Sequence, residues 1–429
     1  MNEELRARLG IVQPLASDLG VSKLVSSPKD ASALQRNADV MTVTQTPQTL
    51  NFELPEDLKL LKRSLREFVE KELWPITDQV EDSDEIPPST IAKMKDMGLF
   101  GLPFAEEYGG AGVGELGYCV ALEELGRASA AFSNLLGAHC SIGAMAMHLD
   151  GSKELKERYM PTLCAGEKLA CFALSEPGAG SDAANISTSA RQEGEAYLLN
   201  GVKHFITSGD IADFASVFAV TDPTLGARGG ITAFWVDLNG PGVTRGPKDR
   251  KMGIFGSHTC ELIFQDAKVP ADHVIGTVGM GFLTAMKTLD MGRLSLGAGC
   301  VGSASYMLEK SIAYAKERVQ FGKPIAKQQA VQFMLADMAT EIYAGRNMVY
   351  HGAWKADRGE RFSIEAAMVK RYCSDLCIHV VDRALQIHGG SGFMKETGIE
   401  RVYRDSRILA IYEGTNEIQR MIIAEELLK

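Results

Sequence analysis

Two segments of the chain combine small residues, hydroxyls and charges in a way that could bind a ligand. The first runs from Ala173 to Asp182 and reads ALSEPGAGSD. Glycine has no Cβ atom, so backbone N–H groups can approach a ligand closely there, and the serine hydroxyls can donate to ring or phosphate acceptors. From the residues alone, a ligand loop and a turn at a domain junction explain this segment equally well.

The second segment extends from Gln386 to Asp405 and is followed closely by Ile411–Glu417. Its Gly389-Gly390 pair follows a helical run, where exposed N–H groups can donate hydrogen bonds to a pyrophosphate. Glu413 stands between an aromatic residue and a glycine, so its carboxylate could face a cavity from a turn. A single glutamate before glycine is more often a solvated helix cap, and by itself that interpretation is favoured.

Two further patterns carry less weight. The glycines of residues 112–117 match the dinucleotide pattern GxGxxG, but a loop-like stretch precedes them instead of a buried strand, so we expect a plain loop. The cysteines and histidine of residues 373–379 lie on an otherwise apolar helical run, where buried cysteine is the commoner explanation. We therefore expect no metal site.

Composition excludes several classes of protein. The 429 residues include 55 acidic and 45 basic ones, and the resulting charge of −10 argues against nucleic acid as a partner. No apolar run approaches the length of a membrane span, so none is expected. The eight cysteines are scattered through apolar stretches, as reduced thiols usually are. Glu3 and Glu4, and the lack of an apolar core near them, argue against a secretory signal, so we expect a cytoplasmic protein.

Periodicity divides the chain into four parts. Residues 1–51 have low apolar content and no sustained period, as in a linker or extension whose role the sequence does not reveal. Residues 52–170 have a helical period, and residues 171–280 contain short apolar runs between Gly and Pro clusters, as in a small antiparallel β-domain. Residues 281–429 form long helical runs with short connections, as in a four-helix bundle. The predicted fold class is α+β but mostly α, with a helical, a β and a second helical domain.

The β part contains a hairpin signal. Asn200-Gly201 stands between the apolar runs 197–199 and 202–206, and this dipeptide tolerates the positive φ values of a type I′ turn. We therefore expect a hairpin that turns at Asn200-Gly201. Further strands are predicted at Phe214–Val220, Ile231–Val236 and Glu261–Val269.

Taken together, the two ligand-binding segments resemble the motifs of the acyl-CoA dehydrogenase family of flavoenzymes, over about residues 52–429. The second motif matches throughout, whereas the first departs only at its end, where Asn185 replaces the usual small residue. The resemblance implies FAD as cofactor, an acyl-CoA thioester as substrate and an electron-transfer flavoprotein as electron acceptor. It also implies fatty acid β-oxidation and a homo-oligomer, commonly a dimer of dimers.

The resemblance also assigns site residues. Ser181, Asp290, Arg293 and Gly414 would bind the substrate, and Asn134 and Ala138 would lie near the acyl tail, where a small residue at 138 favours short to medium chains. Arg318, Gln329 and the segment Gln386–Gly390 would reach the FAD of a neighbouring subunit. The residues implied at the FAD are Phe172, Ala173, Leu174, Ser175, Gly180, Ser181, Phe205, Ile206, Thr207, Arg318, Phe321, Gln329, Gln386, Ile387, His388, Gly389, Gly390, Thr415, Asn416 and Glu417.

By the same resemblance, Glu413 is the catalytic base. It would remove the α-proton of the thioester while the β-hydride passes to flavin N5. A free glutamate has a pKa of about 4.3 and is too weak a base for an ordinary α-carbon. Exclusion of water would raise that basicity, and donors on the thioester oxygen, including the amide of the base residue, would stabilise the developing enolate.

Four alternatives stay open at this point. Some members of the family place the base on another helix, although the glutamate retained at 413 favours the usual arrangement. An oxidase, or a dehydrogenase of acyl groups on a carrier protein, would use the same residues. A non-catalytic FAD- or CoA-binding scaffold would predict the loss of Glu413 or of the Asp290 and Arg293 pair, and all three are present.

Overall fold

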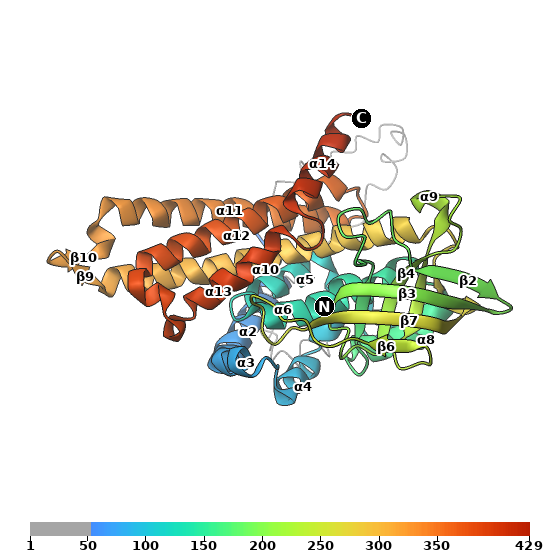
Figure 1. Cartoon of the computed structure of the whole chain (residues 1–429). Helices are drawn as coiled ribbons and strands as arrows, with labels where there is room; N and C mark the ends of the chain where they lie inside the picture. Colours follow the sequence, from blue (N-terminus) through green and yellow to red (C-terminus); the bar gives the residue numbers. More distant parts are fainter. Residues whose placement is uncertain (1–52) are drawn as a thin grey trace, which may run out of the picture.

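The computed structural model describes residues 53–429, so the extension predicted at residues 1–51 lies outside the described residues. Helices, a central sheet and a second set of long helices follow one another along the chain (Figure 1). This order confirms the predicted fold class, α+β but mostly α. None of the helices in the described range is long and apolar enough to cross a membrane.

The N-terminal helices form because apolar residues recur at helical spacing. In α2 (Glu56–Phe68) the side chains of Leu58, Leu61, Leu65 and Phe68 line one face, and all four are buried. Helix α5 is buried almost all round because it packs against α2, α10 and α11. The other segments of this part are η1 (Val69–Leu73), η2 (Trp74–Ile76), α3 (Thr77–Ser83), α4 (Pro88–Asp96), η3 (Leu99–Gly101), η4 (Glu106–Tyr108), α5 (Gly114–Leu125) and α8 (Lys153–Cys164).

Two π-helical turns interrupt the described helices of this part: η1 follows α2, and η5 lies between α6 and α7. Helix α6 (Ala130–Leu136) leads into η5 (Gly137–Gly143), which is a π-helix, and α7 (Met145–Asp150) follows it. The amide of Ala144 donates to the carbonyl of His139, five residues earlier, at 2.8 Å. Such turns inside α-helices frequently lie at functional sites.

The central sheet has eight strands in the order β6-β7-β3-β2-β4-β5-β8, and β1 pairs with β4. Most neighbours are antiparallel, as expected, but β4 runs parallel to both β1 and β2. Alternate residues of β5 enter two cores: Trp235 packs into the helical core and Phe234 into the core of the sheet. The strands are β1 (Ala170–Ala173), β2 (Ser189–Glu193), β3 (Ala196–Thr207), β4 (Phe214–Val220), β5 (Ile231–Asp237), β6 (Val243–Arg245), β7 (Thr259–Pro270) and β8 (Val274–Ile275), with the short turns α9 (Ala227–Gly230) and η6 (Ala271–His273).

The hairpin predicted at Asn200-Gly201 is wrong. Both residues lie inside the continuous strand β3, and the β2–β3 hairpin turns at residues 194–195 instead. The side chain of Asn200 exchanges two hydrogen bonds of 2.9 Å with Asp266 of β7, and a Cβ atom at position 201 would lie 2.5 Å from Thr188 Oγ1. Asn-Gly therefore marks an irregular register and a close backbone approach, which the dipeptide alone does not distinguish from a turn.

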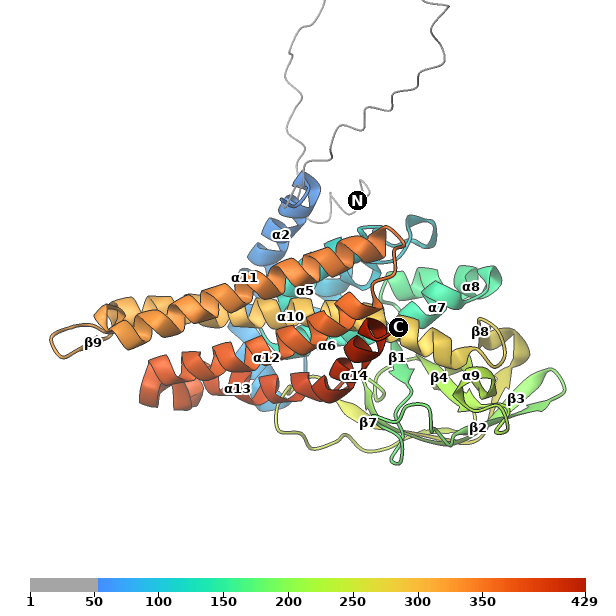
Figure 2. The same ribbon diagram turned by 90° about the horizontal axis from the view of Figure 1, so that it is seen from above.

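Three long helices dominate the C-terminal part and lie side by side in both views (Figures 1 and 2). They are α10 (Gly281–Glu317), α11 (Gln329–Asp357) and α12 (Ser363–His388), and a short β9–β10 hairpin joins α10 to α11 at one end. The remaining segments are β9 (Val319–Gln320), β10 (Lys323–Pro324), η7 (Ile325–Lys327), η8 (Gly389–Phe393), η9 (Lys395–Thr397), α13 (Ile399–Ser406), η10 (Arg407–Ala410) and α14 (Asn416–Leu427).

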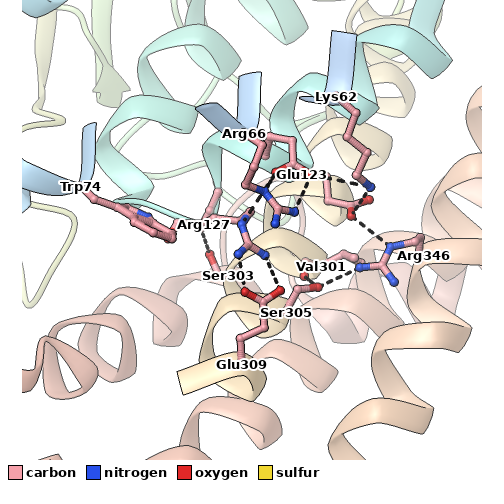
Figure 3. A network of polar contacts seen from close by, with 12 residues as sticks. Lys62, Arg66, Trp74, Glu123, Arg127, Val301, Ser303, Ser305, Glu309 and Arg346 are labelled. Atoms are coloured by element: carbon pink, nitrogen blue, oxygen red, sulfur yellow. Dashed lines mark hydrogen bonds and ion pairs between the residues drawn. The ribbon is translucent and has the colours of Figure 1, made fainter. Parts of the chain in front are cut away.

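A network of charges ties the N-terminal helices to the long ones (Figure 3). Glu123 on α5 is buried and accepts hydrogen bonds from Lys62 of α2 at 2.8 Å and Arg346 of α11 at 3.0 Å. Arg127, also buried, donates to Glu309 of α10 at 3.0 Å. Buried ions of this kind are costly to unpair, so the network fixes how α5 sits against α10, the helix that also carries part of the candidate site.

Candidate active site

Glu413 lies in a tight turn between η10 and α14. Its φ angle is +54°, which is unusual for a residue with a side chain, and Gly414 follows with φ +86°. The side-chain amide of Gln419 donates to the carbonyls of both Glu413 and Gly414, at 3.2 and 3.0 Å. The hydroxyl of Thr415 accepts from the amide of Ile418 and so caps α14. The strained turn is therefore held in place by the helix that follows it.

The carboxylate of Glu413 points into the protein against α10 and η5. Its Oε2 atom is buried and has no hydrogen-bond partner among the described residues. A Cβ atom at Gly292 of α10 would lie 2.6 Å from this oxygen and 2.8 Å from Cγ2 of Ile142. Burial raises the pKa of Glu413 to about 7, against the opposing charges of Arg293 and Lys370. An unpartnered carboxylate with such a pKa is suited to accept a proton near neutral pH.

Asp290 and Arg293 belong to the same site, although more than a hundred residues separate them from Glu413. Arg293 is buried on α10 and donates to Asp290 at 2.7 Å. Its guanidinium also approaches the Glu413 turn, since a Cβ atom at Gly414 would lie 3.8 Å from Arg293 Nη2. The structure thus brings together three of the predicted substrate-binding positions and the predicted base. Contact of these positions with CoA stays a prediction.

The predicted flavin loop leaves the end of β1 and is anchored by a buried ion pair. Lys203 of β3 donates to Glu176 at 2.7 Å and to the carbonyl of Leu174 at 3.0 Å. The carboxylate of Glu176 also accepts from Ser187 and from the amide of Thr188. Burial would raise the pKa of Glu176, but Lys203 and these donors hold it well below its usual range. Sequence reasoning missed Lys203, because a lysine inside a strand gives no signal of its partner.

Phe205, Ile206 and Thr207 form the end of β3. The ring of Phe205 is 65% exposed, and its backbone has φ +58°. Ile206 is buried beneath it, and the ring of His204 packs edge-on against Phe205 with 3.8 Å between ring centroids. A large apolar ring held exposed on a strained backbone is a flat surface against which an aromatic ligand can stack.

A second group of predicted contacts lies elsewhere in the chain. Arg318 and Gln329 flank the β9–β10 hairpin, and Phe321 lies in its turn and is 94% exposed. The hairpin lies at the end of α10 that is far from the sheet (Figure 2). The segment Gln386–Gly390 ends α12. That these residues reach the FAD of a neighbouring subunit stays a prediction.

Not all side chains of this group face outward. Gln386, Gly389 and Gly390 are exposed, whereas Ile387 is buried. His388 is buried as well: its ring stacks on Tyr314 with 4.3 Å between centroids, and its Nδ1 lies 2.8 Å from the carbonyl of Ala384. The side chains of Ile387 and His388 therefore hold the end of α12 in place and leave its backbone available.

The three residues after Gly414 differ in the same way. Thr415 caps α14 and Glu417 is exposed on its first turn. Asn416 is buried, and its side chain bonds to Lys370, Ser374 and Asp375 of α12. The Asn416 side chain is thus occupied inside the protein, so of this residue only the backbone is left to face a flavin.

The residues present fit an FAD. Cβ atoms built at Gly180, Gly389 and Gly390 meet no other atom within 4 Å, so no protein neighbour requires glycine there. These exposed backbones match the close approach that a dinucleotide needs. The exposed ring of Phe205 offers a surface for the flavin ring, and the exposed glycine backbones offer donors for the phosphates.

Asn134 on α6 and Ala138 on η5 belong to the helical run that faces α10. Ala138 is buried, and Ile142 of the same run touches the space beside Gly292. A chain of hydroxyls fixes this wall: Ser295 of α10 donates to Ser141 at 2.8 Å, and Tyr118 of α5 lies 2.9 Å from Ser141. No sequence motif marked this hydroxyl chain.

Comparisons with known proteins agree with this geometry. The three domains of acyl-CoA dehydrogenase match the chain, the N-terminal domain at residues 55–167, the middle domain at 171–267 and the C-terminal domain at 279–428. The chain belongs to the acyl-CoA dehydrogenase family. It is therefore an FAD-dependent oxidoreductase that acts on CH–CH groups.

Three relatives illustrate the range of the family. The chain is 45% identical over 369 residues to an acyl-CoA dehydrogenase of Bacillus subtilis, covering 86% of this chain and 97% of the relative. It is 44% identical to subunit CarC of the caffeyl-CoA reductase-Etf complex of Acetobacterium woodii, covering 87% and 99%. Its fold matches butyryl-CoA dehydrogenase from Megasphaera elsdenii with a TM-score of 0.86 and 41% identity, covering 89% and 100%.

Proposed function

We propose that the protein oxidises a saturated, short-chain acyl-CoA to the trans-2-enoyl-CoA, with Glu413 as the base that removes the α-proton. The observation that carries this proposal is the buried Oε2 atom of Glu413, which has no partner among the described residues and lies beside Gly292. A carboxylate kept free of hydrogen bonds is ready to receive a proton from substrate. FAD, when bound, accepts the hydride that leaves the β-carbon.

The chain's own residues perform the rest of the task. Burial raises the pKa of Glu413 to about 7, which brings its basicity closer to that required at an α-carbon. The amide N–H of Glu413 has no acceptor within the described part of the chain, so it is free to donate to the thioester oxygen. Proton removal and stabilisation of the enolate oxygen would then come from the same residue.

The binding residues divide between cofactor and substrate. We assign the loop from Phe172 to Ser181 and the wall Phe205–Thr207 to the flavin of the same chain. Arg318, Gln329 and the end of α12 would bind the FAD of a neighbouring subunit, which makes the protein a homo-oligomer, as a dimer of dimers. Asp290 and Arg293 would bind the CoA thioester.

A short acyl chain is supported by the wall opposite the base. Ile142 fills space directly beside Gly292, and the hydroxyl chain through Ser141 places polar groups behind it. These hydroxyls are bonded to one another, so they hold the wall in place against a longer acyl tail. The likeness to butyryl-CoA dehydrogenase also favours a short substrate, and a role in β-oxidation in the cytoplasm would follow.

The electron partner and the direction of the reaction form a second question. The similarity to a subunit of a caffeyl-CoA reductase-Etf complex favours an electron-transfer flavoprotein as partner. It equally favours a second candidate function, reduction of a 2-enoyl-CoA, because the same base and flavin serve both directions. An oxidase, or an enzyme for acyl groups on a carrier protein, would share the site.

One titration tests these proposals. Saturated acyl-CoAs of increasing length are added anaerobically to the FAD-loaded protein while the visible flavin absorbance is recorded. We expect rapid bleaching by butyryl-CoA and slow or no bleaching by long chains. Absence of bleaching by every acyl-CoA would refute the proposed substrate, and rapid reoxidation on admitting air would identify an oxidase. Reoxidation of a chemically reduced flavin by an enoyl-CoA, without bleaching by any saturated acyl-CoA, would favour the reductase.

A further inference from the structure

Lys370 is a buried lysine that no step of the proposed reaction uses. It lies on the inner face of α12 and has no exposed surface. Its ammonium donates to Oδ1 of Asn416 at 3.0 Å. No carboxylate oxygen of residues 53–429 forms an ion pair with it within 4.0 Å, so the described structure buries this cation against a neutral amide. Such an arrangement is costly unless a charge nearby compensates it.

Through Asn416, Lys370 is connected to the Glu413 turn. Asn416 is the first residue of α14 and follows Glu413 by three positions. Besides Lys370, its amide group contacts Ser374 at 2.9 Å and Asp375 at 2.8 Å, both on α12. The turn is therefore held by two sets of hydrogen bonds, those of Gln419 to its carbonyls and those of Asn416 to residues of α12. A shift of Lys370 would move the backbone that carries the base.

The charge of Lys370 also acts on Glu413. The charged groups that face the Glu413 carboxylate are Arg293 from α10 and Lys370 from α12, and both favour its ionised form. Facing Lys370 are Glu413, the Cys300 thiol, Asp375 and, with the opposite effect, Arg293. Burial lowers the pKa of Lys370 to about 8, and Glu413 is the strongest of the charges that raise it.

We propose that Lys370 is the positioning residue of the base: it fixes the Glu413 turn through Asn416, and its charge keeps the buried carboxylate ionised. This inference rests on the proposed role of Glu413. Arg293, whose charge acts on the carboxylate more strongly, is also bonded to Asp290 at 2.7 Å, so the two cations act on the carboxylate together. Lys370, without an ion-pair partner among the described residues, has its full charge available to the carboxylate.

The test is the pH dependence of flavin reduction in the FAD-loaded protein under saturating butyryl-CoA. Lys370→Gln keeps a donor for Asn416 and removes the charge, whereas Lys370→Arg keeps the charge. We expect Lys370→Gln to move the acidic midpoint upward by about one pH unit, with up to about a tenfold loss of rate below the midpoint and a retained high-pH plateau. Lys370→Arg should keep the wild-type midpoint. The matched control is Lys355→Gln, because Lys355 is half-buried and paired with Glu365 away from the turn.

A merely structural role would lower the rate equally at all pH values or reduce the FAD content, and would leave the midpoint in place. An unmoved midpoint in Lys370→Gln, or the same upward shift in Lys370→Arg, would overturn the inference.

A second measurement does not depend on activity. Thermal unfolding is compared for wild type, Lys370→Gln, Glu413→Gln and the double variant at a pH between the pKa of Glu413, about 7, and that of Lys370, about 8, where both side chains carry charge. If the charges interact, Lys370→Gln lowers Tm more in the wild-type background than in Glu413→Gln. Equal losses in both backgrounds would refute the interaction. Should no acyl-CoA bleach the wild-type flavin, the proposed function fails, yet this cycle still decides whether Lys370 acts on Glu413.

Discussion

Replacing Glu413 by glutamine should make the protein more stable and much less active. Glutamine has nearly the same shape, so it fits between Gly292 and Ile142, but it cannot accept the α-proton. Loss of a general base costs about 10²–10⁴-fold in the rate of the step that it serves. The FAD-binding residues are unchanged, so the variant should be purified yellow.

The gain in stability follows from the pKa. Burial raises the pKa of Glu413 from 4.5 to about 7, so the folded protein binds more protons than the unfolded chain between these values. The ionised carboxylate therefore destabilises the fold increasingly as the pH rises through this window. A shift of this size corresponds to about 3 kcal/mol above the folded pKa, and glutamine removes that cost.

Two assays check the paired outcome. Stopped-flow reduction of the flavin by butyryl-CoA measures the chemical step, and urea unfolding at about pH 5 and about pH 9 measures the stability difference on either side of the pKa. Glu425→Gln serves as the control, because Glu425 is exposed on α14 and should change neither quantity. Near-wild-type reduction by Glu413→Gln would remove it from the role of base. If the stability difference between wild type and Glu413→Gln does not grow with pH, ionisation of the Glu413 carboxylate does not destabilise the folded protein.

Three further predictions concern other parts of the site. Lys203→Met leaves Glu176 buried without its cation, so we expect a loss of about 3 kcal/mol in urea unfolding and a low FAD-to-protein ratio by absorbance. Phe205→Ala removes an exposed ring from a strained backbone, so we expect weaker FAD binding by fluorescence titration with nearly unchanged Tm; unaltered FAD affinity would contradict the assigned flavin wall. Gly292→Ala places a Cβ atom 2.6 Å from Glu413 Oε2, so the carboxylate must move, and we expect about a tenfold lower kcat with unchanged FAD content.

The sequence was most informative where pattern and structure share one cause. The leucines of α2 recur at helical spacing because one face of that helix is buried, and the runs at 214–220 and 231–236 form strands because both cores of the sheet require apolar side chains. The hairpin predicted from Asn200-Gly201 was wrong because β-bulges and tight turns favour the same residue types. Only the pairing with β7 separates the two, and that partner is more than sixty residues away.

The sequence motif predicted part of the candidate site, and the structure added the residues that surround it. The motif pointed to Glu413, but not to the buried Gly292 that makes room for its carboxylate. Lys203 and Lys370 escaped notice because a buried lysine is identified by its surroundings, which come from other strands and helices. Asn416 belongs to the predicted flavin contacts, yet its side chain is bonded to α12.

The π-helical turn η5 has a consequence for how this enzyme could change over evolution. A π-turn arises when a helix holds one residue more than α-helical bonding needs. Deleting one codon within residues 137–143 would let α6 and α7 join as a regular helix, and it would rotate Ala138 and Ile142 away from their present directions. The wall of the acyl site would then be replaced in one event, and the hydrogen bond of 3.1 Å from the amide of Ala170 in β1 to His139 would have to form anew. The wall of the acyl site can thus change through a segment that contains neither Glu413 nor the flavin loop.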